Sequence, residues 1–185
     1  MEDLLHAPGF LGTNANFAAD ITLILSLLVG ICFSIGALWA KQAQALEAAH
    51  PKGSPGSESA WTRAGTLFNR HRIIQSSGAF LNVILVLWLM ILPYRDFVLR
   101  DLVAPRPRPD AFYWVTTLHA IIGFFAFTIG NFVVLRGNNL VPESFRFQNY
   151  KPWMRAAFAL YMATTVIGIW VYVTWFITIT NTPIY

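Results

Sequence analysis

Charged residues are scarce in this chain, and four long stretches lack them altogether. Only 12% of the 185 residues are Asp, Glu, Lys or Arg, whereas 56% are hydrophobic. None of the four charged types occurs in residues 21–40, 73–93, 111–135 or 156–180. Each stretch matches the roughly 20 residues that a helix needs to cross the hydrocarbon core of a bilayer. Because lipid offers no hydrogen bonds to the backbone, we predict four transmembrane helices and an all-α fold.

The signals of common enzyme classes are also missing. The sequence has no Gly-rich phosphate loop, no Cys/His cluster, and no Ser/His/Asp set or pair of carboxylates at a suitable place. The single cysteine, Cys32, excludes an internal disulfide and is interpreted as a small packing residue. The longest segment outside the four stretches, residues 41–72, is too short to bury a core of its own. We therefore predict one transmembrane domain over residues 1–185, a four-helix bundle without enzymatic activity.

The basic residues that are present lie mostly on one side of the predicted membrane. Nine of the 13 Lys and Arg residues fall between the first and second stretches or between the third and fourth. The positive-inside rule then predicts that these two loops face the cytoplasm and that both termini lie outside. Topology accounts for the pI near 9.5, so we predict contact with the lipid bilayer and none with nucleic acid.

Helix-end signals extend the first helix beyond the membrane. Asn16 or Asp20 is predicted to cap its N-terminus, because short polar side chains accept hydrogen bonds from the first free backbone N–H groups. The stretch up to His50 favours helix, and Pro51 is predicted to end it. Residues 61–72 are predicted to approach the second span as an interfacial helix.

Small residues recur at helical spacing in the first span, at Ser26, Gly30, Ser34 and Gly36. Such rows let another helix approach closely, so we predict that they serve helix packing. Because so little of the chain lies outside the membrane, this face is also a predicted docking surface for a partner subunit. An alternative is a groove that holds a flat pigment or a lipid tail.

His119 is the most informative single residue, because it lies about eight residues, or roughly 12 Å, inside the third span. An ionisable residue at this depth suggests function, and neutral imidazole is a common metal ligand. One interpretation is therefore a haem or metal ligand, with Met90 as a candidate partner on the outer side. The other is a packing histidine that hydrogen-bonds near Thr116 or Tyr94. His71 opens the second span near the inner surface, as a basic headgroup anchor or as a ligand or proton group.

Polar residues gather at the predicted inner ends of the second and third spans. Gln75 lies one turn after His71, and Asn131 lies near the end of the third span. Buried amides commonly join helices through hydrogen bonds, which is one interpretation. The other is a site for a lipid headgroup, formed by Arg72, Gln75, Asn131 and Arg136.

The order and spacing of several short motifs resemble those of the YozB-like (also CtaM-like) family of four-helix membrane proteins. These are His71-Arg72, Leu118-His119, Leu135-Arg136, Trp153-Met-Arg155 and the run Thr165–Tyr172. The resemblance implies a link to haem–copper oxidase maturation and a pair of histidines near each membrane face. Here Tyr94-Arg95 and Tyr150-Lys151 stand where the second histidine of each pair is expected, which marks a divergent member.

These observations predict a multi-pass protein of the bacterial cytoplasmic (inner) membrane. Its expected role is that of a non-catalytic accessory or assembly subunit of a respiratory, haem–copper oxidase-linked or photosynthetic electron-transfer complex. The alternative is a membrane anchor subunit that carries a b-type haem or a quinone site, with His119 as ligand.

Overall fold

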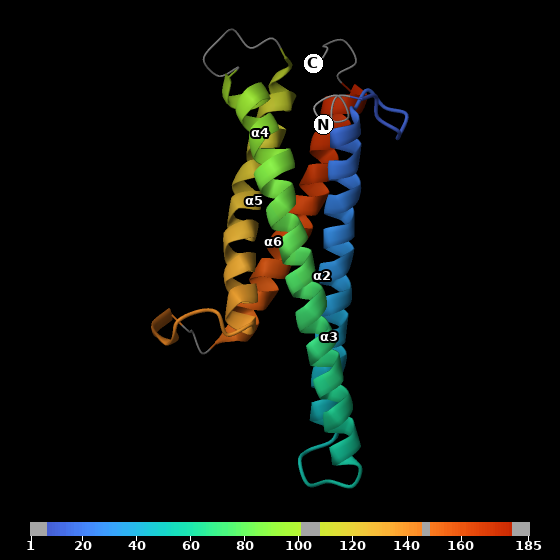
Figure 1. The fold of residues 1–185 in the computed structure, drawn as a ribbon, viewed down its shortest axis with the longest axis vertical. Helices are drawn as coiled ribbons and strands as arrows, with labels where there is room; N and C mark the ends of the chain where they lie inside the picture. Colours follow the sequence, from blue (N-terminus) through green and yellow to red (C-terminus); the bar gives the residue numbers. More distant parts are fainter. Residues whose placement is uncertain (1–6, 101–107, 146–148, 179–185) are drawn as a thin grey trace.

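The computed structural model describes residues 7–100, 108–145 and 149–178, and within them the fold is all-α (Figure 1). The long helices are α2 (Phe17–Ala49), α3 (Ser57–Ile84), α5 (Asp110–Gly137) and α6 (Tyr150–Val173). A short 3₁₀ turn covers Glu143–Phe145, and the π-helical turn Thr174–Thr178 prolongs α6. Four helices are long and apolar enough to cross a membrane, so the predicted four-helix transmembrane bundle is confirmed.

The second membrane helix is longer than the predicted span. After α3 it continues through a π-helical segment (Leu85–Met90), α4 (Ile91–Pro93) and a second π-helical segment (Tyr94–Leu99). Pro93 has no N–H, and in an α-helix its ring would clash with the carbonyl four residues earlier, so wider turns around it relieve the strain. Residues 61–72 are helical, as predicted, but they do not form a separate interfacial helix. These residues belong to α3, where Ala60 and Ala64 are buried and allow close pairing with α2.

The four helices form two antiparallel hairpins, α2 with α3 and α5 with α6 (Figure 1). The start of α2 and the end of the π-helical turn after α6 lie at the same end of the bundle, as the predicted topology requires. We call this the outer end, after that topology, and the opposite end the inner end. At the inner end the α2–α3 hairpin extends well beyond α5 and α6.

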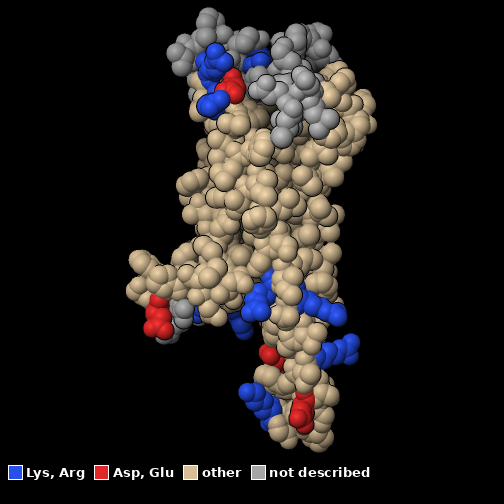
Figure 2. All heavy atoms as spheres, viewed as in Figure 1, with Lys and Arg blue, Asp and Glu red and all other residues tan. Residues whose placement is uncertain are grey.

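The middle of the molecule presents an uncharged surface. Figure 2 shows Lys and Arg side chains gathered toward the inner end, a smaller charged group at the outer end, and none across the middle of this face. Large hydrophobic side chains such as Phe80, Leu87 and Phe124 are more than half exposed there. An exposed apolar band of this kind is what lipid-facing helices present.

The small residues of α2 face helices of the same chain. A Cβ on Gly30 would lie 3.5 Å from the Thr165 hydroxyl of α6, and the Ser34 hydroxyl lies 3.8 Å from the Met162 sulfur of the same helix. A Cβ on Gly36 would lie only 2.4 Å from Gln75 Nε2 of α3. The Ser26 hydroxyl donates to the Leu23 carbonyl of its own helix. Gly30 and Gly36 thus bring α6 and α3 close to α2 at the places where a partner helix was expected.

Residues 7–16 fold over the outer end and are fastened by the buried carboxylate of Asp20. Asn16 is the N-cap of α2, since its side chain accepts from the Ala19 N–H. Asp20 instead accepts from the Phe10 and Leu11 N–H groups (2.6 and 2.8 Å) and from the Tyr172 hydroxyl (2.5 Å). Its side chain is completely buried. Of the two predicted caps, the structure therefore selects Asn16.

Candidate functional site: a cavity at the inner end

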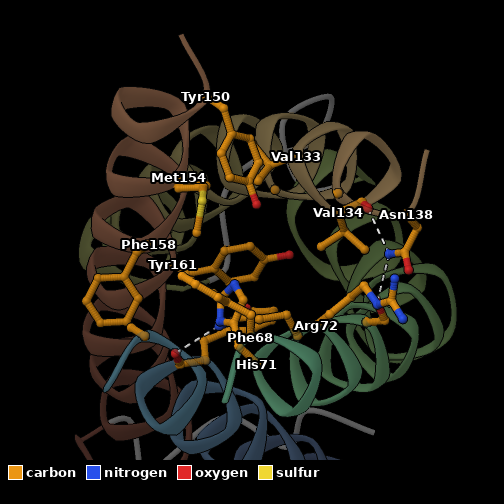
Figure 3. A pocket seen from close by; sticks show the side chains of 17 residues that line it. Phe68, His71, Arg72, Val133, Val134, Asn138, Tyr150, Met154, Phe158 and Tyr161 are labelled. Atoms are coloured by element: carbon orange, nitrogen blue, oxygen red, sulfur yellow. Dashed lines mark hydrogen bonds between the residues drawn. The ribbon is translucent and has the colours of Figure 1, made fainter. Parts of the chain in front are cut away.

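A cavity of about 280 Å³ opens between the two hairpins at the inner end, and residues of all four long helices line it. Much of its lining is aromatic or aliphatic. Figure 3 looks into the cavity and shows the hydroxyl groups of Tyr150 and Tyr161 pointing into the open space. Polar side chains of α3 and of the end of α5 complete the wall, namely His71, Arg72, Gln75, Ser76 and Asn138.

The α3 wall is fixed to backbone carbonyls of α2. The His71 Nδ1 atom lies 2.8 Å from the Gly36 carbonyl oxygen, and Gln75 Nε2 donates to the Phe33 carbonyl at 3.1 Å. The absence of a side chain on Gly36 makes this approach feasible, because a Cβ there would overlap Gln75. The close approach of α2 and α3 therefore also sets the position of the polar groups that face the cavity.

The contact with Gly36 determines how the His71 ring is protonated. A carbonyl oxygen can only accept, so Nδ1 must carry the hydrogen. In the neutral ring the remaining nitrogen, Nε2, then has a free lone pair. His71 lines the cavity, so this ring offers one hydrogen-bond acceptor, or one ligand atom, to a molecule bound there.

Tyr161 of α6 is the point where all four helices meet. Its hydroxyl accepts from Asn82 Nδ2 of α3 at 2.9 Å, and its ring meets the Phe33 ring of α2 edge-on at a centroid distance of 4.4 Å. On the α5 side, a Cβ on Gly130 would lie 2.4 Å from the Tyr161 ring. Because Asn82 uses an acceptor position of the hydroxyl, the O–H of Tyr161 is left to donate.

The end of α5 closes the cavity against α3. Asn138 Nδ2 donates to the Ser76 hydroxyl and to the Val134 carbonyl, both at 2.9 Å. Arg72 carries the only charged side chain among the described lining residues; it is exposed, and its Nη2 donates to Asn69. The cavity is thus lined by neutral polar groups and aromatic rings, with one cation near solvent.

The predicted inner-face site is partly assembled. Arg72 and Gln75 line the cavity, whereas Asn131 donates to the Phe127 carbonyl of its own helix and Arg136 is not among the lining residues. Tyr161, Asn138 and Ser76 were not predicted as site residues. Two sequence features could have indicated that a large side chain fills the centre of the bundle. They are a small residue, Gly130, and an amide, Asn82, each inside an apolar span.

His119 lies elsewhere, between α5 and α6. A Cβ on Gly168 would lie 3.0 Å from its Cε1 atom, so the imidazole edge packs directly on the backbone of α6. Thr116 and Tyr94, the predicted partners, bond to other groups: Thr116 accepts from the Trp175 indole, and Tyr94 donates to Thr117. The His119 Nδ1 atom is buried without a hydrogen-bond partner among the described residues.

Met90 ends the first π-helical segment of the second membrane helix, and neither Met90 nor His119 lines the cavity. The described part of the chain contains no group of three or more His, Cys, Asp or Glu residues that could hold a metal ion. The two membrane histidines are therefore in different settings. His71 faces open space, whereas His119 packs against α6.

Comparison with known proteins returned no matching family model, no similar curated protein and no similar solved structure. The resemblance to YozB-like proteins remains a prediction from the sequence motifs.

Proposed function

We propose that this chain is a non-catalytic accessory subunit of an electron-transfer complex in the bacterial inner membrane, and that it holds an amphipathic molecule in the inner cavity. The observation that carries the proposal is the cavity itself. Its wall combines aromatic rings with a few polar side chains, as the walls of small-molecule sites commonly do. Because it lies at the end of a membrane bundle, a ligand can keep its polar head there and its apolar part in lipid.

The apolar exterior supports the role of a subunit. Nearly all of the described chain lies in the four helices, so a partner must bind chiefly to their lipid-facing sides. The small residues of α2 are already occupied within the chain. We therefore place the docking surface on the exposed faces of α3 and α5, which carry large side chains such as Phe80 and Phe125.

Filling the cavity tests the proposal. Ala157 is buried and lines the cavity, and leucine there would occupy ligand volume. We expect Ala157→Leu to lower the amount of amphipathic molecule recovered by organic extraction of the purified protein at least fivefold. Ala163→Leu, an equal change on the exposed side of α6, should leave recovery unchanged. The larger complex should co-purify with tagged wild-type protein. Equal recovery from both variants, or purification of the protein without other subunits, would contradict the proposal.

A haem-bearing anchor is the second candidate function, and one observation favours it. His71 and Met154 both line the cavity, and His71 Nε2 is free to act as a ligand atom. The site at His119 fits haem poorly, because the imidazole edge already packs on Gly168. At about 280 Å³ the cavity also lies slightly below the roughly 300–1,000 Å³ usual for ligand pockets.

Absorption spectra separate the two candidates. We expect the purified protein to show no reducible Soret band. If a haem band is present, His71→Ala should remove it and His119→Ala should leave it intact, because only His71 faces the cavity. A haem band that depends on His119 would restore the alternative predicted from the sequence and would require α6 to move away from that ring.

A further inference from the structure

We propose that the molecule held in the inner cavity is a quinol, an aromatic ring with two hydroxyl groups and an apolar tail, and that the site binds this reduced form more tightly than the corresponding quinone. The inference rests on the proposed function, in that the cavity must hold an amphipathic molecule. It names the chemical class of that molecule from the groups on the cavity wall.

The shape of the wall suits a flat ring. Phe33, Phe158 and the two tyrosine rings contribute aromatic surface, while Gly130 lets the Tyr161 ring lie directly on the α5 backbone. Aromatic rings favour contact with other rings through stacked or edge-on arrangements. A cavity of about 280 Å³ accommodates one substituted ring, and its tail can extend into the lipid around the bundle.

The charge of the wall argues for a neutral head. Arg72 is the only charged residue among the described lining residues, and its exposed guanidinium already bonds to Asn69. A phosphate drawn into the cavity would exchange its water for a wall whose own side chains, apart from the exposed Arg72, are neutral, which is costly. Uncharged oxygens can instead be satisfied by the neutral polar groups that are present.

Some hydrogen-bond acceptors on the cavity wall have no described donor, and these can distinguish a quinol from a quinone. His71 uses Nδ1–H on the Gly36 carbonyl, which leaves Nε2 as an acceptor. Gln75 places its amide nitrogen on the Phe33 carbonyl, and no described residue donates to its amide oxygen. These two acceptors match O–H donors on a ligand. A quinol brings two such donors, whereas a quinone brings none.

Tyr161 provides a donor that suits both forms of the ring. Its hydroxyl accepts from Asn82, so its own proton is free for a ligand oxygen. Carbonyl and phenolic oxygens both accept, and this contact therefore adds affinity without favouring one form. The preference for the quinol over the quinone therefore depends on the acceptors. Among them, His71 Nε2 can be removed by a single substitution with the least change elsewhere.

The experiment compares a decyl-substituted benzoquinone with its two-electron-reduced quinol. The full-length protein is placed in phosphatidylcholine nanodiscs, and both affinities are measured by titration calorimetry without oxygen. We expect the quinol to bind about tenfold more tightly, since one hydrogen bond contributes roughly 0.5–1.5 kcal/mol and more than one acceptor is available. Equal affinities, or tighter binding of the quinone, would overturn the inference.

His71→Asn is the sharpest variant, because an asparagine amide can still donate to the Gly36 carbonyl while the Nε2 acceptor is lost. We expect it to lower the preference for the quinol to about twofold and to leave quinone affinity nearly unchanged. His119→Asn, the same change outside the cavity, should keep the tenfold preference. An unchanged preference in His71→Asn would contradict the assignment of His71.

The controls distinguish failure of this inference from failure of the proposed function. If the ring does not bind but an extracted phospholipid or another amphipath is lost in Ala157→Leu, the quinol inference is wrong and the proposed binding role stands. If neither the ring nor any extracted molecule depends on Ala157, both are wrong. Circular dichroism of each variant confirms that the helices are formed.

Discussion

Replacing Asp20 with alanine should release residues 7–16 from the outer end of the bundle while the membrane helices stay folded. The carboxylate is completely buried and accepts three hydrogen bonds, from the Phe10 and Leu11 N–H groups and the Tyr172 hydroxyl. Alanine removes all three acceptor contacts at once. Gly9 fits this arrangement because a Cβ there would lie 2.6 Å from the same carboxylate.

The loss should be large because the contacts form one connected chain. Ala15 N–H donates to the Thr13 hydroxyl, which lies 2.8 Å from the Tyr172 hydroxyl, which in turn donates to Asp20. Hydrogen bonds to a charged group contribute about 1.5–3 kcal/mol each, and water can replace some of them near the surface. We therefore expect the closed position of residues 7–16 to lose about 2–4 kcal/mol of stability.

Hydrogen–deuterium exchange measures this effect directly. The Phe10 and Leu11 amides should exchange about 30- to 1,000-fold faster in Asp20→Ala, which corresponds to that free energy. Glu58→Ala removes an acidic residue from the first turn of α3 at the opposite end and should leave both amides unchanged. Slow exchange that persists in Asp20→Ala would mean that other contacts hold the segment.

The membrane helices could be predicted because their signal is local. A stretch without charges and about 20 residues long has few alternatives in a bilayer, and all four predicted stretches lie within long helices over the described residues. The end of α2 could be predicted equally well, because Pro51 cannot continue a helix and α2 ends at Ala49. The start of the second membrane helix was harder to predict, because residues 61–72 are polar enough to suggest a surface segment, yet they belong to α3, which pairs with α2.

The site was harder to predict because its contacts join distant parts of the chain. At the cavity, the Tyr161 hydroxyl meets Asn82, which lies 79 residues earlier in the chain. At the outer end, Asp20 and Tyr172 are 152 residues apart, and the acid resembled an ordinary outer-side charge or cap. Small residues at Gly30 and Gly36 indicate that a helix comes close, but not which helix it is. Depth alone made His119 seem the more functional histidine. In the structure, however, it is His71 that faces open space. The hydrophobic periodicity of the sequence contains no information about where a cavity lies.

Gly130→Ala should destabilise the bundle, although helix propensity alone predicts that it stabilises α5. Alanine is about 1 kcal/mol better than glycine inside a helix, so propensity alone predicts a gain. At Gly130, however, the new Cβ would lie 2.4 Å from the Tyr161 ring. A rigid ring cannot yield as a flexible chain end does, and the overlap must move α5 away from α6 or turn Tyr161.

Turning Tyr161 would break contacts with two more helices. Its hydroxyl would leave Asn82 of α3, a buried amide, and its ring would lose the edge-on contact with Phe33 of α2. Overpacking costs about 1–3 kcal/mol, and an unsatisfied buried amide costs a similar amount. We therefore expect a net loss of about 2–4 kcal/mol, together with a smaller or reshaped cavity.

Gly65→Ala is the matched control for this prediction. Gly65 lies inside α3, and a Cβ there would meet nothing within 4 Å, so alanine should raise stability by up to about 1 kcal/mol. Thermal unfolding in detergent, followed by circular dichroism, should thus move in opposite directions for the two glycine substitutions. If both variants gain stability, α5 and α6 can separate at no cost, and Tyr161 does not fix the centre of the bundle. If Gly130→Ala loses stability in the wild-type chain but not when it is made in Tyr161→Ala, the loss comes from the overlap with the ring, because removing the ring removes the overlap.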